Sequence, residues 1–127
     1  MTQSHRMGVV AVVVTYQPAL EVLEKLLDAI IPQVDSVVVV DNGSDTVFEA
    51  WNNNRQKYAV EVLLLGENSG IAAAQNVGIQ WARNRGAAFV LLMDQDSIPA
   101  PDMVEKLLST ISEQPTPAAA GDRKSVV

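Results

Sequence analysis

The stretch VVAVVVT, residues 9–15, consists of β-branched residues and a single alanine. A continuous run of this kind, without polar alternation, is typical of a parallel strand that is buried on both faces. The run is too short to cross a bilayer. A turn at Gln17-Pro18 and a helical pattern follow at once, which favours a strand over the apolar part of a signal peptide. We therefore expect the first strand of a parallel sheet here.

Strand and helix patterns alternate along the rest of the chain. Further strands are predicted at 36–41, 59–65 and 87–94. Helical patterns follow the four strands, at 18–30, 46–57, 71–85 and 101–112. Four strand–helix (βα) units of this length predict an α/β, Rossmann-like parallel sheet with strand order 3-2-1-4 and helices on both faces.

The composition is that of an acidic globular protein with few aromatic residues. The 127 residues carry a net charge of −6 and include no run of Lys or Arg, so a nucleic-acid partner is not expected. No cysteine is present, which excludes disulfides and thiolate metal sites. A chain without disulfides fits a reducing compartment, so we expect a cytoplasmic location.

All four predicted strands end in polar residues. In sheets of this kind, ligands bind beyond the carboxyl ends of the strands, at the crevice where the strand order reverses. For the order 3-2-1-4 the reversal falls between the first and fourth strands. We therefore expect Thr15 and Asp96 on either side of one crevice. The four polar ends are Thr15-Tyr16, Asp41-Asn42-Gly43, Gly66-Glu67-Asn68 and Asp94-Gln95-Asp96.

Asp94 and Asp96 are spaced so that, in extended chain, both project to the same side while Gln95 turns away. Two unit charges 4 Å apart repel by about 1 kcal/mol in water and by about 4 kcal/mol at an effective dielectric of 20. A divalent cation such as Mg²⁺ or Mn²⁺, shared with substrate phosphates, would offset that repulsion. A solvated loop with two helix-capping acids explains the spacing as well, so both interpretations stay open.

Asp41 also has two interpretations. An Asp before Asn-Gly commonly forms a turn by accepting hydrogen bonds from nearby backbone N–H groups. A carboxylate at a strand end can instead accept from a ring N–H of a pyrimidine-type base. The loop and helix start ENSGIAAAQNVG (67–78) has neither the Lys of a P-loop nor the G-x-G-x-x-G spacing. We expect Ala73-Ala74 to allow close helix–sheet packing, with Asn68 and Asn76 fixing the loop.

Four ordered motifs resemble the inverting family-2 glycosyltransferases, which have the GT-A fold, and in particular their bacterial rhamnosyltransferase-like branch. The motifs are VVVTYQP, VVVVDNGSD, ENSGIAAAQNVGI and LLMDQDSIP, and the likeness covers residues 8–112. This resemblance implies that Thr15 and Tyr16 line a base and ribose pocket and that Asp41 hydrogen-bonds uracil or thymine. It further implies that Asn68 and Asn76 shape the neighbouring loop. Asp94 would lie near the ribose and the metal, with Asp96 as the direct Mg²⁺ or Mn²⁺ ligand.

The resemblance also implies a domain organisation and partners. Residues 1–7 would be a tail, 8–112 the nucleotide-sugar-binding part of a truncated GT-A domain, and 113–127 a linker or the start of the next strand. The donor would be a UDP- or dTDP-sugar. The acceptor would be a saccharide or a lipid-linked molecule in a growing cell-surface polysaccharide, which would place the full enzyme peripherally at the inner face of the membrane.

The resemblance further implies that the catalytic general base lies beyond Val127, so we expect no sugar transfer by this polypeptide alone. Open strand edges favour self-association, so homo-oligomers are expected. Two other Mg²⁺-binding folds fit less well: a receiver domain has acids after strands one and three, and a haloacid-dehalogenase-type phosphatase has Asp-x-Asp after strand one. A non-catalytic nucleotide-binding or interaction fragment is the remaining alternative.

Overall fold

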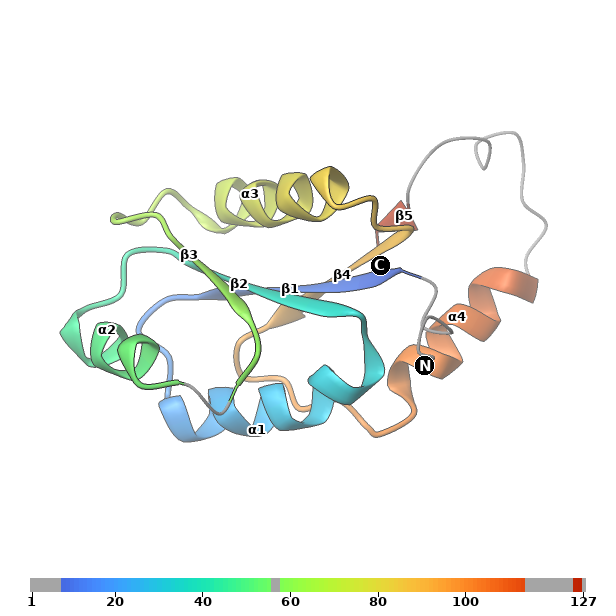
Figure 1. Ribbon diagram of the computed structural model, residues 1–127, viewed down its shortest axis with the longest axis horizontal. Helices are drawn as coiled ribbons and strands as arrows, with labels where there is room; N and C mark the ends of the chain where they lie inside the picture. Colours follow the sequence, from blue (N-terminus) through green and yellow to red (C-terminus); the bar gives the residue numbers. More distant parts are fainter. Residues whose placement is uncertain (1–7, 56–57, 114–124, 127) are drawn as a thin grey trace.

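A five-stranded parallel sheet forms the centre of the computed structural model, which describes residues 8–55, 58–113 and 125–126 (Figure 1). The central strand, β1 (Val9–Thr15), pairs with β2 (Ser36–Asp41) on one side and β4 (Phe89–Asp94) on the other. β3 (Glu61–Leu64) extends the sheet beyond β2, and β5 (Ser125–Val126) pairs with the start of β4. The order β3-β2-β1-β4-β5 confirms the predicted order of the first four strands.

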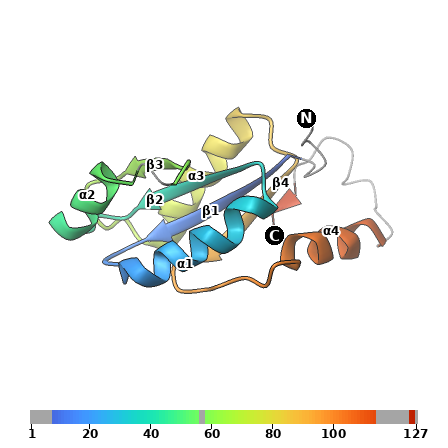
Figure 2. The ribbon, with the colours of Figure 1, turned by 60° about the horizontal axis from the view of Figure 1, so that its bottom comes forward.

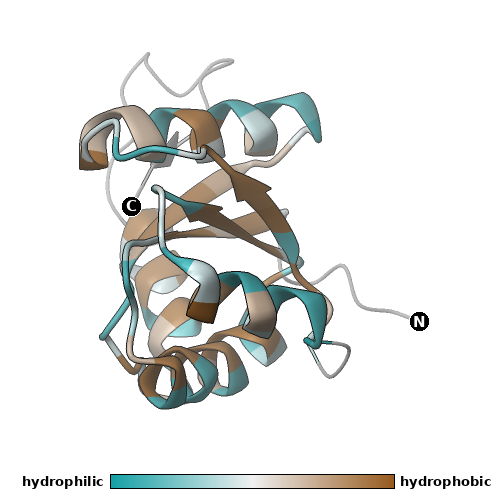
Figure 3. Ribbon diagram, turned by 90° about the vertical axis from the view of Figure 1, so that its left-hand side faces the viewer, coloured by the Kyte–Doolittle hydropathy of each residue, from teal (hydrophilic) through white to brown (hydrophobic). Residues whose placement is uncertain are grey.

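Helices cover both faces of the sheet, as predicted. α3 (Ile71–Asn84) lies alone on one face, whereas α1 (Leu20–Ile30), α2 (Thr46–Asn53) and α4 (Met103–Glu113) lie on the other (Figures 1 and 2). A short 3₁₀ helix, η2 (Ile31–Gln33), follows α1 directly. Figure 3 shows the apolar strands enclosed between these two helical layers.

Alternate residues of β1 contribute to two separate cores. Val9, Ala11 and Val13 join the buried cluster that contains the apolar side chains of α1. Val10, Val12 and Val14 join the cluster that contains Ala74 and Ala82 of α3. Side chains alternate across a strand, so a run that is apolar at every position requires a helical layer on each side. This double burial is the physical reason for the unbroken valine run.

A strip of small residues lets α3 lie close against the sheet. Ala74, Gly78 and Ala82 are the buried residues of this helix and recur every fourth position. A Cβ added at Gly78 would overlap the side chain of Val12 and press on Val40. The predicted close helix–sheet packing is therefore present at Ala74, whereas Ala73 is exposed.

Several predicted boundaries differ from those of the structure. The helices expected at 18 and 101 begin at Leu20 and Met103, because the prolines lie in the preceding turns. Gln17 has a positive φ of 47° in the first of these turns. The helix expected over 46–57 ends at Asn53, and position 57 lies outside the described residues.

Three further elements are shorter than predicted, by one to three residues. The strands expected at 59–65 and 87–94 are Glu61–Leu64 and Phe89–Asp94, and the helix expected to end at 85 ends at Asn84. Tight backbone hydrogen bonds at Tyr58 and Val60 replace the start of the third strand. The predicted tail, residues 1–7, lies outside the described residues. The predicted linker, residues 113–127, also lies outside them, apart from Glu113 and β5.

Candidate functional site

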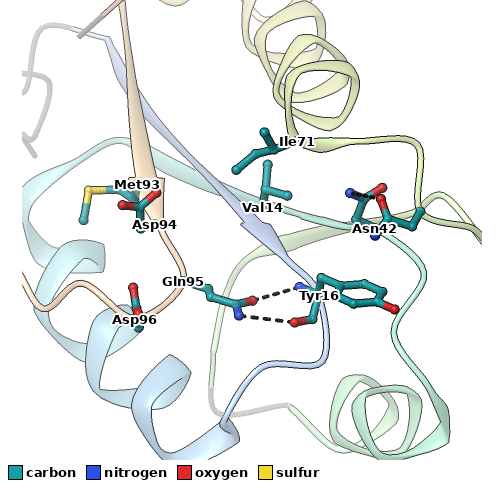
Figure 4. A pocket seen from close by; sticks show the side chains of 9 residues that line it. Val14, Tyr16, Asn42, Ile71, Met93, Asp94, Gln95 and Asp96 are labelled. Atoms are coloured by element: carbon teal, nitrogen blue, oxygen red, sulfur yellow. Dashed lines mark hydrogen bonds between the residues drawn. The ribbon is translucent and has the colours of Figure 1, made fainter.

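A hollow of about 470 Å³ lies at the carboxyl ends of β1 and β4, where the strand order reverses (Figure 4). This is the position at which open parallel α/β sheets bind their ligands. The structure brings together four of the predicted site residues here, namely Tyr16, Asn68, Asp94 and Asp96. The other residues that line the hollow are Val14, Asn42, Ile71, Met93 and Gln95.

The β4 side of the hollow carries two exposed carboxylates. Asp94 is the last residue of the strand, and the chain then turns, with the N–H of Ser97 donating to the Asp94 carbonyl at 3.1 Å. The extended backbone expected through Asp96 is not present, because the strand ends at Asp94, but both carboxylates line one hollow, as predicted. Among the described residues, no donor or cation pairs with either carboxylate, so both are available to a ligand.

Gln95 does not turn away from the hollow, contrary to the prediction. Its Oε1 accepts a hydrogen bond from the N–H of Tyr16 at 2.8 Å. Its Nε2 donates to the carbonyl of Tyr16 at 3.2 Å (Figure 4). The prediction failed because it extended the alternation of the strand past Asp94, where the strand has ended.

Tyr16 and Thr15 differ in their relation to the hollow. Tyr16 is 45% exposed, and its ring forms part of the wall on the β1 side. Thr15 is fully buried and does not line the hollow. Its hydroxyl donates to Asp41 Oδ1 at 2.7 Å. Thr15 is thus separated from Asp96, and the expectation that these two residues face each other across the crevice is wrong.

Asp41 is a buried carboxylate with three donors inside the protein. Its Oδ1 accepts from the hydroxyls of Thr15 at 2.7 Å and Ser44 at 2.6 Å. Its Oδ2 accepts from the N–H of Ser44 at 2.8 Å. The side chain is 3% exposed and lines a second hollow of about 270 Å³ beside α2 rather than the first. These contacts support the turn-forming interpretation. Contact with a base stays a prediction, and Oδ2, which accepts fewer of these hydrogen bonds than Oδ1, would be the atom involved.

Asn42 fixes the loop between β3 and α3 against the end of β2. Its Oδ1 accepts from the N–H of Ser69 at 2.8 Å, and its Nδ2 donates to Asn68 Oδ1 at 3.1 Å. Asn68 Oδ1 also accepts from the N–H of Gly70 at 2.9 Å. Asn68 therefore shapes the loop, whereas Asn76 is exposed on α3 and lies away from the hollow.

Some residues of the hollow had no role assigned from the sequence. Asn42 stands in an Asn-Gly pair, which indicates a turn but not a buried amide (4% exposed) that fixes a second loop. Ile71 is 58% exposed at the start of α3, and Met93 adds a second apolar wall. Ile71 is far from Asp94 and Asp96 in the sequence, so its place in the same hollow becomes visible only in the folded structure.

The carboxylate oxygens of Asp94 and Asp96 are the kind of ligand that suits a divalent cation held jointly with a bound molecule. The described residues contain no cluster of three or more His, Cys, Asp or Glu side chains around one point. Mg²⁺ commonly takes only one or two carboxylates and completes its shell with water and substrate phosphates. Asp94 and Asp96 are exposed and accept no hydrogen bond from the part of the chain that the structure describes, so they fit that mode of binding.

A parallel sheet with the order β3-β2-β1-β4 and helices on both faces defines a Rossmann-like domain, and Asp94 and Asp96 line its reversal crevice. The chain belongs to glycosyl transferase family 2, whose profile matches residues 10–126. Over 100 residues it is 37% identical to the dTDP-rhamnosyl transferase RfbF of Shigella flexneri. That match covers 79% of this chain and 33% of the relative, so the chain spans about a third of the relative's length.

Within the described ranges, none of the helices has the length and apolar character needed to cross a membrane.

Proposed function

We propose that this chain binds the nucleotide-diphospho-sugar donor of an inverting glycosyltransferase that extends a cell-surface polysaccharide. The observation that carries the proposal is a pair of exposed carboxylates, Asp94 and Asp96, which line the hollow between β1 and β4 and have no partner within the described ranges. Membership of glycosyl transferase family 2 supports the reaction class. The acceptor in the full enzyme would be a saccharide or a lipid-linked molecule.

Asp94 and Asp96 would hold Mg²⁺ or Mn²⁺ together with the donor's diphosphate. When bound, the cation would neutralise charge on the diphosphate leaving group, a Lewis-acid role. An acidic crevice repels a diphosphate by itself, so binding should depend on the cation. The chain's own residues would orient the donor: the ring of Tyr16 and the apolar side chain of Ile71 form walls that can pack on the nucleoside or the sugar.

The base of the donor would be a pyrimidine. The dTDP in the name of the Shigella flexneri relative favours thymidine, and a UDP-sugar is the alternative that the same pocket would accept. The relative's name also makes rhamnose the first sugar to test. Asp41 lines the neighbouring hollow beside α2, so it would reach the base only from that side, through Oδ2, which accepts one hydrogen bond among the described residues.

A nucleotide panel tests this function. Calorimetric titration with dTDP, dTDP-rhamnose, UDP, GDP and ADP, each with Mn²⁺, should give weak binding of the thymidine and uridine compounds and none of the purines. dTDP-rhamnose should bind more tightly than dTDP, because the sugar adds contacts in the same hollow. Equal binding of all five compounds would show a non-selective diphosphate site and contradict the assignment of a nucleotide-sugar donor.

A further inference from the structure

Gln95 occupies an unusual position between two strand ends. The ladder between β1 and β4 has its last pair at Val14 and Asp94. Beyond that pair the chain after Asp94 turns, so no strand lies opposite the backbone of Tyr16 on the β4 side. The side chain of Gln95 supplies what a strand would have supplied, accepting from the Tyr16 N–H at 2.8 Å and donating to its carbonyl at 3.2 Å.

A carboxamide is suited to this task because it offers one acceptor and one donor on the same planar group. A carboxylate could only accept hydrogen bonds. A thioether accepts only weakly and cannot donate. The bridge joins residues 79 positions apart and crosses the crevice in which the proposed ligand lies.

We propose that Gln95 is a positioning residue: its amide bridge holds the Asp94–Asp96 turn and Tyr16 in one register, so that the carboxylates and the nucleoside wall face the same hollow. This proposal rests on the proposed function for its ligand. It assigns the middle residue of the acidic turn a task separate from that of the carboxylates on either side. Figure 4 shows the bridge between the two walls of the hollow.

The opposite side of the β1–α1 loop is held independently of Gln95. The N–H of Gln17 donates to Ser44 Oγ at 2.8 Å, and the N–H of Asp45 donates to Gln17 Oε1 at 3.1 Å. Both contacts tie the loop to the end of β2. Loss of Gln95 therefore releases Tyr16 on one side only and removes no apolar contact from either buried cluster. The fold should persist when the bridge is removed.

The test uses Gln95→Met, which keeps the size of the side chain and removes both hydrogen bonds. Gln80→Met is the matched control, because Gln80 is exposed on α3 and, among the described residues, its side chain hydrogen-bonds only to Asn84 on the same helix. Gln95→Asn, whose amide is too short to reach both Tyr16 atoms, provides a second variant if Gln95→Met fails to fold. Two quantities are measured: NMR hydrogen exchange of the Tyr16 amide, and affinities for Mn²⁺ alone and for dTDP with Mn²⁺.

We expect the Tyr16 amide to lose protection in Gln95→Met and the affinity for dTDP with Mn²⁺ to fall about tenfold, the scale of one to two lost hydrogen bonds. Mn²⁺ alone should bind more weakly as well, and Gln80→Met should behave like the wild type. Unchanged exchange at Tyr16 would overturn the bridge. Lost protection with unchanged affinities would overturn the positioning role.

The outcome for the wild type separates this inference from the proposed function. If the wild type binds Mn²⁺ but not dTDP, the proposed function fails, and the Mn²⁺ affinity of Gln95→Met alone decides the role of Gln95. A weaker Mn²⁺ affinity then supports positioning of the acidic turn, and an unchanged one overturns it. If the wild type binds neither, both proposals fall.

Discussion

The two strands that flank β1 both end in an aspartate, but the two aspartates differ in burial and in hydrogen bonding. Asp41, at the end of β2, is 3% exposed and accepts three hydrogen bonds from Thr15 and Ser44. Asp94, at the end of β4, is exposed, as is Asp96, and neither meets a donor among the described residues. An acid at the carboxyl end of a strand is therefore not in itself a ligand site. Whether it is available to a ligand depends on the hydrogen bonds that it already accepts from the protein.

The difference follows from the cost of burying charge. A carboxylate withdrawn from water needs hydrogen bonds to compensate for its lost hydration, and for Asp41 the hydroxyls of Thr15 and Ser44 provide them. At the end of β4, water screens the two carboxylates and leaves their lone pairs open. The first arrangement contributes to stability, and the second is available for a cation.

Asp41→Ala should have the largest effect on stability. It leaves the buried Thr15 hydroxyl and the Ser44 donors without their acceptor, so we expect the free energy of unfolding to fall by about 3 kcal/mol. Urea denaturation followed by circular dichroism measures this. A loss below about 1 kcal/mol would mean that the contacts at Asp41 are not structural and would make base recognition its main role.

Thr15→Val should have an intermediate effect. The substitution keeps the shape of the side chain and removes one donor to Asp41, so we expect a loss of about 1–2 kcal/mol in the same denaturation experiment. Thr110→Val is the control, because Thr110 is exposed on α4 and donates only to the carbonyl of Lys106. Equal losses for the two variants would show that the buried hydroxyl of Thr15 has no special weight.

Asp94→Asn and Asp96→Asn should have the smallest effect on stability. Neither side chain has a partner to lose among residues 8–55, 58–113 and 125–126, and each change relieves repulsion between the two carboxylates. We expect the free energy of unfolding to change by no more than about 0.5 kcal/mol, the usual range for surface substitutions. A loss above 1 kcal/mol for either variant would remove the contrast with the end of β2.

The sequence was sufficient for the topology because each strand signal had a single physical meaning. The stretches 9–14 and 37–40 are apolar at every position, which requires helices on both faces and hence a parallel sheet. The strand ends were also visible, since polar residues follow each run. The exact helix starts were not, because Pro18 and Pro101 can occupy either a first helical turn or the turn before it.

The site was less predictable, because its geometry depends on where periodic structure stops. The alternation of β4 ends at Asp94, so strand periodicity does not predict the direction of the Gln95 side chain. Thr15 and Tyr16 are neighbours in the sequence, but only Tyr16 lines the hollow. Asn76 lies on α3, so the helix and not the loop determines its position. Contacts between distant loops, such as that of Asn42 with Ser69, leave no periodic signal.

The central claim is that the carboxylates at the end of β4 bind a cation together with a nucleotide diphosphate. Calorimetric titration of dTDP into the wild type, Asp96→Asn and Asp28→Asn, in Mn²⁺ and in chelator, tests it most directly. Asp28→Asn removes the same charge from an exposed position on α1, away from the hollow. The wild type and Asp28→Asn should bind in Mn²⁺ and not in chelator, and Asp96→Asn should bind in neither. Equal affinity of the wild type in chelator and in Mn²⁺, or unchanged binding by Asp96→Asn, would contradict the claim.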